Sequence, residues 1–584
     1  MKDHNTVVTF NNPQVAALPR HLKQYVVEQD YGRYTPVDQA VWRYVMRQNY
    51  HHLKDIAYYP YIPGLKAAGL SIEKIPDLQE MNDALAKIGW GAVTVDGFIP
   101  PAAFMEFQAY RVLVIAADIR NLEHIEYTPA PDIIHESAGH APIIADVAYH
   151  NYLSYFGSIG AKATYSAQDV ELYEAIRALS VIKESPAATA QEIQAAEDRV
   201  AFCQENMKEP SEMALLSRLH WWTVEYGLIG TLAEPKIYGA GLLSSIGESA
   251  SCMRAEVTKL PYTIDAVNYP YDITKPQPQL FVTPTFKNLK EVLEQFADTM
   301  AFRVGGAYGL KKAIASNTTC TVVYSSGLQV CGTFTTLKTF GNDEPVLIVT
   351  NGPTALSYHN HVLPGHDQTA HPNGFSSPVG KLKSIETPLE FRLIEIDKFL
   401  VLHFESGIMV MGMVTGVLRI DGRNLLISFT DCTVMDRRGE ILFDPSWGVY
   451  DLAVGEHITS VFCGAADKDA FTETAYVPAT RSKRPKVNNA NLELQGLYQK
   501  VRDCRQQRVV YSVLIEVWEN LQQYHPGDWL CALEILEILA NEDIKQGIAL
   551  EINTFLKIKS ENEPALKKLI KAGLKLIDEL KQAK

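Results

Sequence analysis

The sequence predicts three successive regions: a mainly α-helical domain over residues 21–315, a β-rich domain over 318–475 and a helical region over 492–584. Three observations predict this order. Apolar side chains recur at helical spacing in segments such as 36–56 and 286–303. After residue 318 the chain turns to short runs rich in Val, Thr and Phe, separated by Gly-containing turns. Near the end, Leu side chains recur three and four residues apart.

The first domain should follow a loose leader formed by residues 1–20. Its expected elements, in chain order, are helices over 36–56, 63–68 and 75–89, a strand and turn over 93–100, a helix over 101–119 and a closing helix over 286–303. Residues 158–218 contain Ala- and Glu-rich runs that favour helices, with Ser185-Pro186 between them. This pattern predicts a helical hairpin on the outside of the domain, and a flap is the alternative.

The second and third regions have patterns of their own. Strands are expected in the second region at 319–324, 344–350, 399–404 and 428–434. One of its loops contains four histidines, namely His359, His361, His366 and His371. Either this loop is simply exposed to solvent, or its histidines bind a second metal ion. Residues 476–491 read as a basic linker. In the last helix, residues recur three and four positions apart at Leu566, Leu569, Gly573, Leu576 and Leu580. The helix face that they form can pack on this chain or on a second copy in a homo-oligomer.

Composition limits the classes of function. Hydrophobic residues make up 47% of the 584 residues and charged residues 21%, as in ordinary globular proteins. The net charge of -14 argues against a nucleic-acid-binding surface. Eight cysteines lie scattered without a CxxC pair, which favours reduced thiols and a cytoplasmic protein. Neither a signal peptide nor a transmembrane run is predicted, so we expect no membrane partner.

Two histidines five residues apart mark the candidate site. Glu136 follows His135 as in the zinc-protease pattern, but His140 comes one residue later than that pattern requires. On an α-helix of about 100° per residue, the second ring would be rotated roughly 140° from the first. Both rings can reach one metal only if the helix ends or distorts near Gly139. Asp132 stands close enough in sequence to orient a ligand.

Glu225 is the candidate third ligand. It lies in an apolar, aromatic run, where an ionised carboxylate is costly unless a partner such as a metal stabilises it. Two histidines and one carboxylate with open positions form the facial triad of non-heme Fe(II) oxygenases. A buried histidine pair with Glu225 paired to an arginine remains the alternative.

These residues resemble the pterin-dependent aromatic amino acid hydroxylases, which act on phenylalanine, tyrosine or tryptophan. The shared motifs are Tyr127-Thr128-Pro129, Pro131-Asp132, His135-Glu136, Gly139-His140, Pro142, Thr223-Val224-Glu225-Tyr226-Gly227-Leu228 and the run over 238–248. The resemblance covers about residues 15–312. It implies that family's catalytic domain and a monooxygenase that uses Fe(II), tetrahydrobiopterin or a related tetrahydropterin, and O2.

The resemblance also implies roles for individual residues. The iron ligands would be His135, His140 and Glu225, with Asp132 behind them. The substrate-binding positions would be Arg120, Tyr127, Thr128, Trp221, Ser244, Ser245, Glu248 and Val282. The pterin-binding positions would be Val95, Gly97, Ile99, Phe104, Met105 and Glu136.

Within the family, two positions favour phenylalanine as the substrate. Trp221 matches the phenylalanine and tyrosine hydroxylases, whereas tryptophan hydroxylases carry Phe there. Val282 stands where tyrosine hydroxylases carry Asp, and a Val wall leaves a buried phenol unpaired at a cost of roughly 1–3 kcal/mol. Two departures from the family are His220, in place of a Tyr, and Val114, in place of a His.

Three other functions remain open from the sequence. The chain could hydroxylate tryptophan or tyrosine instead. The same three side chains could hold zinc in a hydrolase, although the late second histidine argues against it. A binding or assembly protein acting through the C-terminal half is the remaining alternative.

Overall fold

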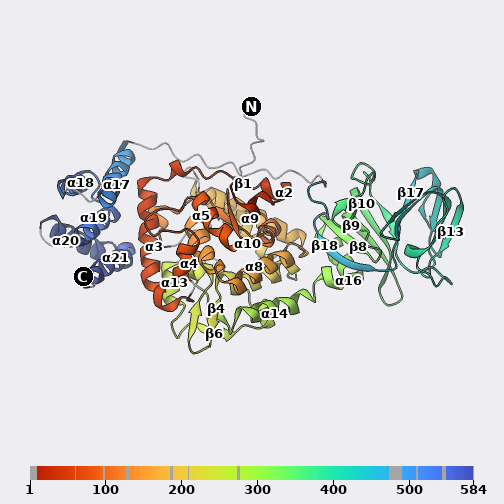
Figure 1. Cartoon of the computed structure of the whole chain (residues 1–584), viewed down its shortest axis with the longest axis horizontal. Helices are drawn as coiled ribbons and strands as arrows, with labels where there is room; N and C mark the ends of the chain where they lie inside the picture. The colour runs from red at the N-terminus through yellow and green to blue at the C-terminus, as the bar shows by residue number, and fades with distance from the viewer. Residues whose placement is uncertain are drawn as a thin grey trace.

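A computed structural model describes residues 10–59, 61–96, 99–126, 132–184, 188–207, 209–272, 276–471, 489–507, 511–541 and 547–582. These residues form three regions in a row (Figure 1). The first region lies in the middle, the β-rich region at one end and the C-terminal helices at the opposite end. None of the described helices is both long and apolar enough to cross a membrane.

The N-terminal segment differs from the loose leader expected over residues 1–20. Residues from that stretch form helix α1 (Pro13–Ala16), followed by α2 (Arg20–Lys23) and strand β1 (Val26–Val27). Val15 and Leu18 are buried in a cluster with strands of the first region. These two apolar side chains fix the segment to the first region.

The long helix expected over 36–56 is present as α3 (Pro36–Ile56). Thr35 and Asp38 form a capping box that satisfies free N–H groups of its first turn. The next two helices are α4 (Tyr61–Ala67) and α5 (Leu78–Leu85).

Residues 101–119 differ from the single helix that was expected. Helix α6 (Pro101–Ala109) ends early, and strand β3 (Val112–Ala116) follows and pairs in parallel with β2 (Gly91–Val95). All five residues of β3 are buried. A short apolar run with three β-branched residues favours a buried strand over a helix, and this preference decides the segment. Together β2, α6 and β3 form a β-α-β unit.

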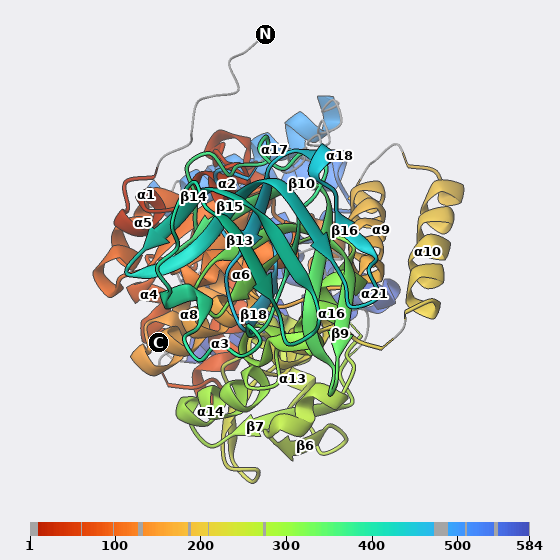
Figure 2. The same ribbon diagram turned by 90° about the vertical axis from the view of Figure 1, so that its right-hand side faces the viewer.

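The insertion forms the hairpin that its sequence predicts. Helices α9 (Ala167–Glu184) and α10 (Ala190–Glu205) pack on each other, and Figure 2 shows them side by side at the edge of the molecule. The flanking helices are α7 (Ala141–Ile144), α8 (Val147–Gly160) and α11 (Glu212–His220).

The first region mixes helices with two small sheets. One sheet has the order β1-β2-β3, and the other the order β5-β4-β7-β6. The elements of its last part are β4 (Leu228–Gly230), β5 (Pro235–Ile237), α12 (Ala240–Ser244), α13 (Ile246–Ser251), β6 (Thr258–Pro261), β7 (Gln279–Thr283) and α14 (Phe286–Ala297).

The β-rich region consists of two antiparallel sheets, reached through helices α15 (Ala301–Val304) and α16 (Gly306–Ser316). One sheet contains β8 (Thr319–Tyr324), β9 (Gln329–Phe340), β10 (Glu344–Tyr358), β11 (His361–Val362), β12 (Ser376–Pro378) and β18 (Ile458–Cys463). The other contains β13 (Phe399–His403), β14 (Met409–Ile420), β15 (Arg423–Met435), β16 (Ile441–Phe443) and β17 (Tyr450–Ala453). Two hydrophobic clusters lie in this region, and each combines residues of both sheets: the first includes Leu426 of β15, and the second includes Leu347 of β10.

The C-terminal helices pack on α3. They are α17 (Asn489–Gln507), α18 (Tyr511–Tyr524), α19 (Leu530–Asn541), α20 (Ile548–Asn562) and α21 (Pro564–Gln582). The Tyr44 hydroxyl donates to the Leu569 carbonyl at 2.7 Å, and Arg43 forms an ion pair with Glu534 at 2.8 Å. The last helix therefore packs on this chain. Residues 476–488 of the expected linker lie outside the described residues.

Candidate active site

Both candidate ligand motifs lie on π-helical turns. His135 and His140 lie in one, η4 (Ile134–His140), and Glu225 ends the other, η5 (Trp221–Glu225). A π-helix bonds residue i to residue i+5, so residues five apart lie over one another. This geometry resolves the late position of the second histidine. The helix distorts near Gly139 as expected, and Gly139 also permits a close approach, because a side chain there would meet the Ala240 carbonyl oxygen of α12 at 2.7 Å.

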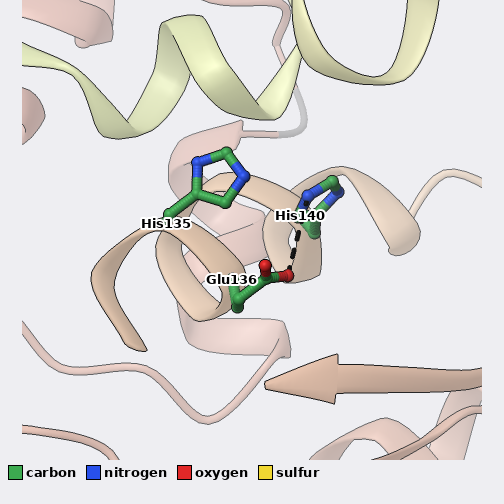
Figure 3. A group of neighbouring side chains, drawn as sticks. All are labelled: His135, Glu136 and His140. Carbon is green, nitrogen blue, oxygen red and sulfur yellow. Dashed lines mark ion pairs between the residues drawn. The ribbon is translucent and has the colours of Figure 1, made fainter. Parts of the chain in front are cut away.

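The three candidate ligands converge on one point. Figure 3 shows the His135 and His140 rings beside Glu136, and the ring centroids are 5.3 Å apart. Glu225 Oε2 lies 3.3 Å from His135 Nε2, and its Oε1 lies 3.3 Å from His140 Nε2. Glu136 is more distant, with its Oε2 3.9 Å from His140 Nε2. Two imidazoles and one carboxylate thus present four donor atoms to one small volume.

The charges at this point favour a cation. Burial acts to raise the pKa of Glu225, but His140 and His135 hold it well below its usual range. Burial acts to lower the pKa of His135, but Glu225 raises it to about 9. His140 Nε2 is buried and has no hydrogen-bond partner within the described residues. A metal ion there would supply both the positive charge and the missing partner, so the donor set fits Fe(II).

Neighbouring groups orient His135. Its Nδ1 lies 2.9 Å from Ser244 Oγ, and Ser244 donates its own proton to the Ala240 carbonyl at 2.8 Å. The ring therefore donates from Nδ1 and directs Nε2 at Glu225. Asp132 Oδ1 accepts the His135 backbone N–H at 3.0 Å. This contact is consistent with the orienting role expected for Asp132.

Arg120 is already paired. Its Nε and Nη2 donate to Asp132 Oδ2 and Oδ1 at 2.7 and 2.9 Å, a bidentate pair. Both side chains are buried, at 4% and 5% exposure. Burial acts to raise the pKa of Asp132, but Arg120 lowers it overall. Asp132 thus fixes the orientation of the Arg120 guanidinium group.

The other expected substrate residues lie around η5 and after it. Trp221 is stacked between Tyr226 and Tyr271, at 4.6 and 4.5 Å between ring centroids. Ser245 caps α13 by accepting the Glu248 backbone N–H, and burial raises the pKa of Glu248. Val282 lies buried on β7, beside β4. Tyr127 and Thr128 lie outside the described residues.

The residues expected to bind the pterin do not all lie together in the structure. Val95, Ile99 and Phe104 share one hydrophobic cluster behind β2 and β3. Met105 faces α8 instead, since a side chain on Gly160 would come within 2.7 Å of its Cγ. Glu136 lies with the histidines, and burial raises its pKa. Gly97 is outside the described residues.

Two side chains near the site were not predicted as site residues. His220 Nδ1 lies 4.0 Å from Glu225 Oε1, and burial lowers its pKa to about 4, so it stays neutral. Its ring meets Phe104 edge-on at 5.8 Å. The sequence flagged His220 only as a departure from the family. Nothing in the sequence marked Tyr271, which stacks on Trp221, as a site residue, because a lone Tyr in a loop has no distinctive spacing.

Comparisons with known proteins address the first region. The phenylalanine-4-hydroxylase of Pseudomonas aeruginosa is 29% identical over 284 residues, which cover 48% of this chain and 90% of that enzyme. That of Chromobacterium violaceum is 28% identical over 275 residues, which cover 47% and 78%. A crystal structure of the latter enzyme, with bound iron(III) and 7,8-dihydrobiopterin, is 26% identical, covers 47% of this chain and 88% of its own, and has a TM-score of 0.37.

A sequence profile for one family matches most of the first region. It describes the biopterin-dependent aromatic amino acid hydroxylases and matches residues 23–191 and 206–311. The gap between the two matches covers nearly all of α10, the second helix of the hairpin. The profile match and the sequence relatives agree that the first region is similar to the biopterin-dependent aromatic amino acid hydroxylases.

Proposed function

We propose that this chain hydroxylates the ring of phenylalanine to give tyrosine, with Fe(II), a tetrahydropterin and O2. One oxygen atom enters the ring, and two electrons from the pterin reduce the other. The convergence of His135, His140 and Glu225 carries this proposal. The family profile and the relatives named phenylalanine-4-hydroxylase support it.

The side chains of the site would bind the iron, orient its ligands or bind the substrate. His135, His140 and Glu225 would hold the iron, which would supply the activation of O2. Ser244 and Asp132 fix the His135 ring and its backbone. Arg120, held by Asp132, would bind the substrate carboxylate with its remaining N–H groups. Neutral His220 adds no second charge beside Glu225.

The choice of phenylalanine is supported by apolar walls. Trp221 forms a rigid aromatic stack with two tyrosines, which suits a flat ring. Val282 offers no hydrogen bond to a phenol, so a tyrosine substrate would bury its hydroxyl unpaired. All of the named relatives above are phenylalanine hydroxylases.

A competition assay tests the substrate. The iron-loaded protein would receive equimolar phenylalanine, tyrosine and tryptophan with a tetrahydropterin and O2, and mass spectrometry would follow each product. We expect tyrosine from phenylalanine as the main product. Product mainly from tryptophan or tyrosine would contradict the substrate choice.

A matched pair of variants tests the metal site. Glu225→Gln should lose bound iron and activity while its thermal unfolding shows a retained fold. Glu256→Gln is the control, because it makes the same chemical change on an exposed side chain. Iron content in Glu225→Gln equal to that of the control would refute the ligand assignment.

A further inference from the structure

Two of the four histidines in the β-rich region are held in fixed places. His366 and His371 lie in the loop between β11 and β12, and both are anchored to β10. The His366 carbonyl accepts the Leu356 N–H at 2.9 Å, and the His371 carbonyl accepts the Thr354 N–H at 3.0 Å. Their side chains are 19% and 12% exposed, and their rings stack with 5.7 Å between centroids.

A carboxylate from the other sheet meets these two rings. Asp451 lies on β17, opposite Ser428 of β15, and the Ser428 hydroxyl donates to its Oδ1 at 2.5 Å. Its Oδ2 faces the histidines, 3.8 Å from His366 Nδ1 and 3.7 Å from His371 Nε2. The two imidazole nitrogens are 3.5 Å apart. The three donor atoms therefore form a nearly equilateral triangle.

These separations fit a shared ion better than direct hydrogen bonds. The two distances to Asp451 exceed the range of a hydrogen bond, and the two imidazole nitrogens, at 3.5 Å, stand at its upper limit, although all three groups are largely buried. A tetrahedral zinc ion with ligands at ~2.0–2.2 Å sets its donors about 3.4 Å apart. The triangle therefore needs only a slight contraction to bind such an ion.

We propose that His366, His371 and Asp451 form a second metal site for a divalent transition metal ion of the zinc class. Imidazole and carboxylate are ligands suited to these ions. The ion would join the loop held by β10 to β17, and so fasten the two sheets to each other. Ser428 would orient the carboxylate from behind. His359 and His361 stay outside the site, with side chains 73% and 86% exposed.

Metal content of the full-length protein tests this proposal without any activity assay. All variants would carry Glu225→Gln, so that the first site does not contribute. After loading with Zn²⁺ and gel filtration, we expect about one bound zinc per chain in this background. Adding His371→Ala should remove it and weaken Zn²⁺ binding in calorimetry at least a hundredfold. Adding His361→Ala, on the adjoining strand β11, should change neither.

A second variant distinguishes the loss of metal binding from misfolding. Asp451→Asn keeps the size of the side chain and should lose zinc as His371→Ala does, with an unchanged circular dichroism spectrum. In the Glu225→Gln background, zinc should raise the melting temperature, and both variants should abolish that rise. Equal zinc content in the His371→Ala, Asp451→Asn and His361→Ala proteins would overturn the proposal.

Discussion

Arg120 and Asp132 tie the expected substrate pocket to the expected metal site. The arginine donates two hydrogen bonds to the aspartate, which also accepts the backbone N–H of His135. Both side chains are buried, so each depends on the other to remain ionised. A change at Arg120 should therefore affect stability as well as substrate affinity.

Arg120→Met should cost about 3–5 kcal/mol of unfolding free energy, because it leaves the Asp132 carboxylate buried and unpaired. It should also raise the apparent Michaelis constant for phenylalanine, since the charged partner of the substrate carboxylate is gone. Urea unfolding and steady-state kinetics measure the two effects.

The double variant Arg120→Met/Asp132→Asn separates these effects. Removing the stranded charge should recover part of the stability but none of the substrate affinity. A double variant that is as unstable as Arg120→Met alone would show that the ion pair is not the source of the loss.

At the scale of elements, the sequence predicted the long helix α3 well and the local distortion of η4 poorly. The sequence pattern of α3 predicted the bounds that the helix has, from Pro36 to Ile56. The spacing of His135 and His140 showed that an ordinary helix could not serve, but not that two π-helical turns would do so. Backbone hydrogen bonding in such a turn depends on packing against other elements, here α12, which no local pattern reveals.

The β2-α6-β3 unit shows a second limit. Residues 101–116 are apolar almost throughout, so their periodicity does not separate helix from strand. Pairing with β2 decides the outcome for β3. The candidate ligand residues could be singled out because their chemistry is distinctive, whereas Tyr271 becomes a neighbour of Trp221 only through the fold.

The α9–α10 hairpin should be dispensable for catalysis. It packs chiefly on itself, and its ion pair Lys183–Glu197, at 2.8 Å, joins its own two helices. Replacing residues 168–204 by a short Gly/Ser linker should leave iron content and phenylalanine turnover unchanged. A variant that keeps its iron but loses turnover would favour the alternative of a flap over the site.

At the scale of the whole molecule, a buried charge network joins the C-terminal helices to α3. Arg43 and Arg505 meet Glu534 at 2.8 and 2.5 Å, and Arg43 also donates to Glu537. One hydrophobic core runs through the first region and these helices. The sequence predicted helices here but not their partner, because complementary charges nearly five hundred residues apart leave no local pattern.

This attachment should weaken in acid. Burial acts to raise the pKa of Glu534, but Arg505 and Arg43 hold it below its ordinary 4.5. A lowered pKa stabilises the folded state at pH values above 4.5, and this contribution is lost as the pH falls through the lowered value. Trp529, which packs edge-on against Tyr44 at 5.3 Å, should report the separation by its fluorescence.

Two variants identify the group responsible. Glu534→Gln should release the C-terminal helices more readily at neutral pH and flatten the pH dependence between neutrality and acid. Glu516→Gln, in an exposed pair with Lys500, should behave like the wild type. An acid transition that is the same in both variants would assign the effect to other carboxylates.

The π-helical turn of η4 has a consequence for how such chains are compared. One residue fewer between His135 and His140 would give the His-Glu-x-x-His pattern of zinc proteases on an ordinary α-helix. The two chemistries are thus separated here by a single position in an alignment. A comparison that freely places a gap inside this turn would merge them, whereas one that forbids gaps between the two histidines keeps the oxygenase and the protease apart.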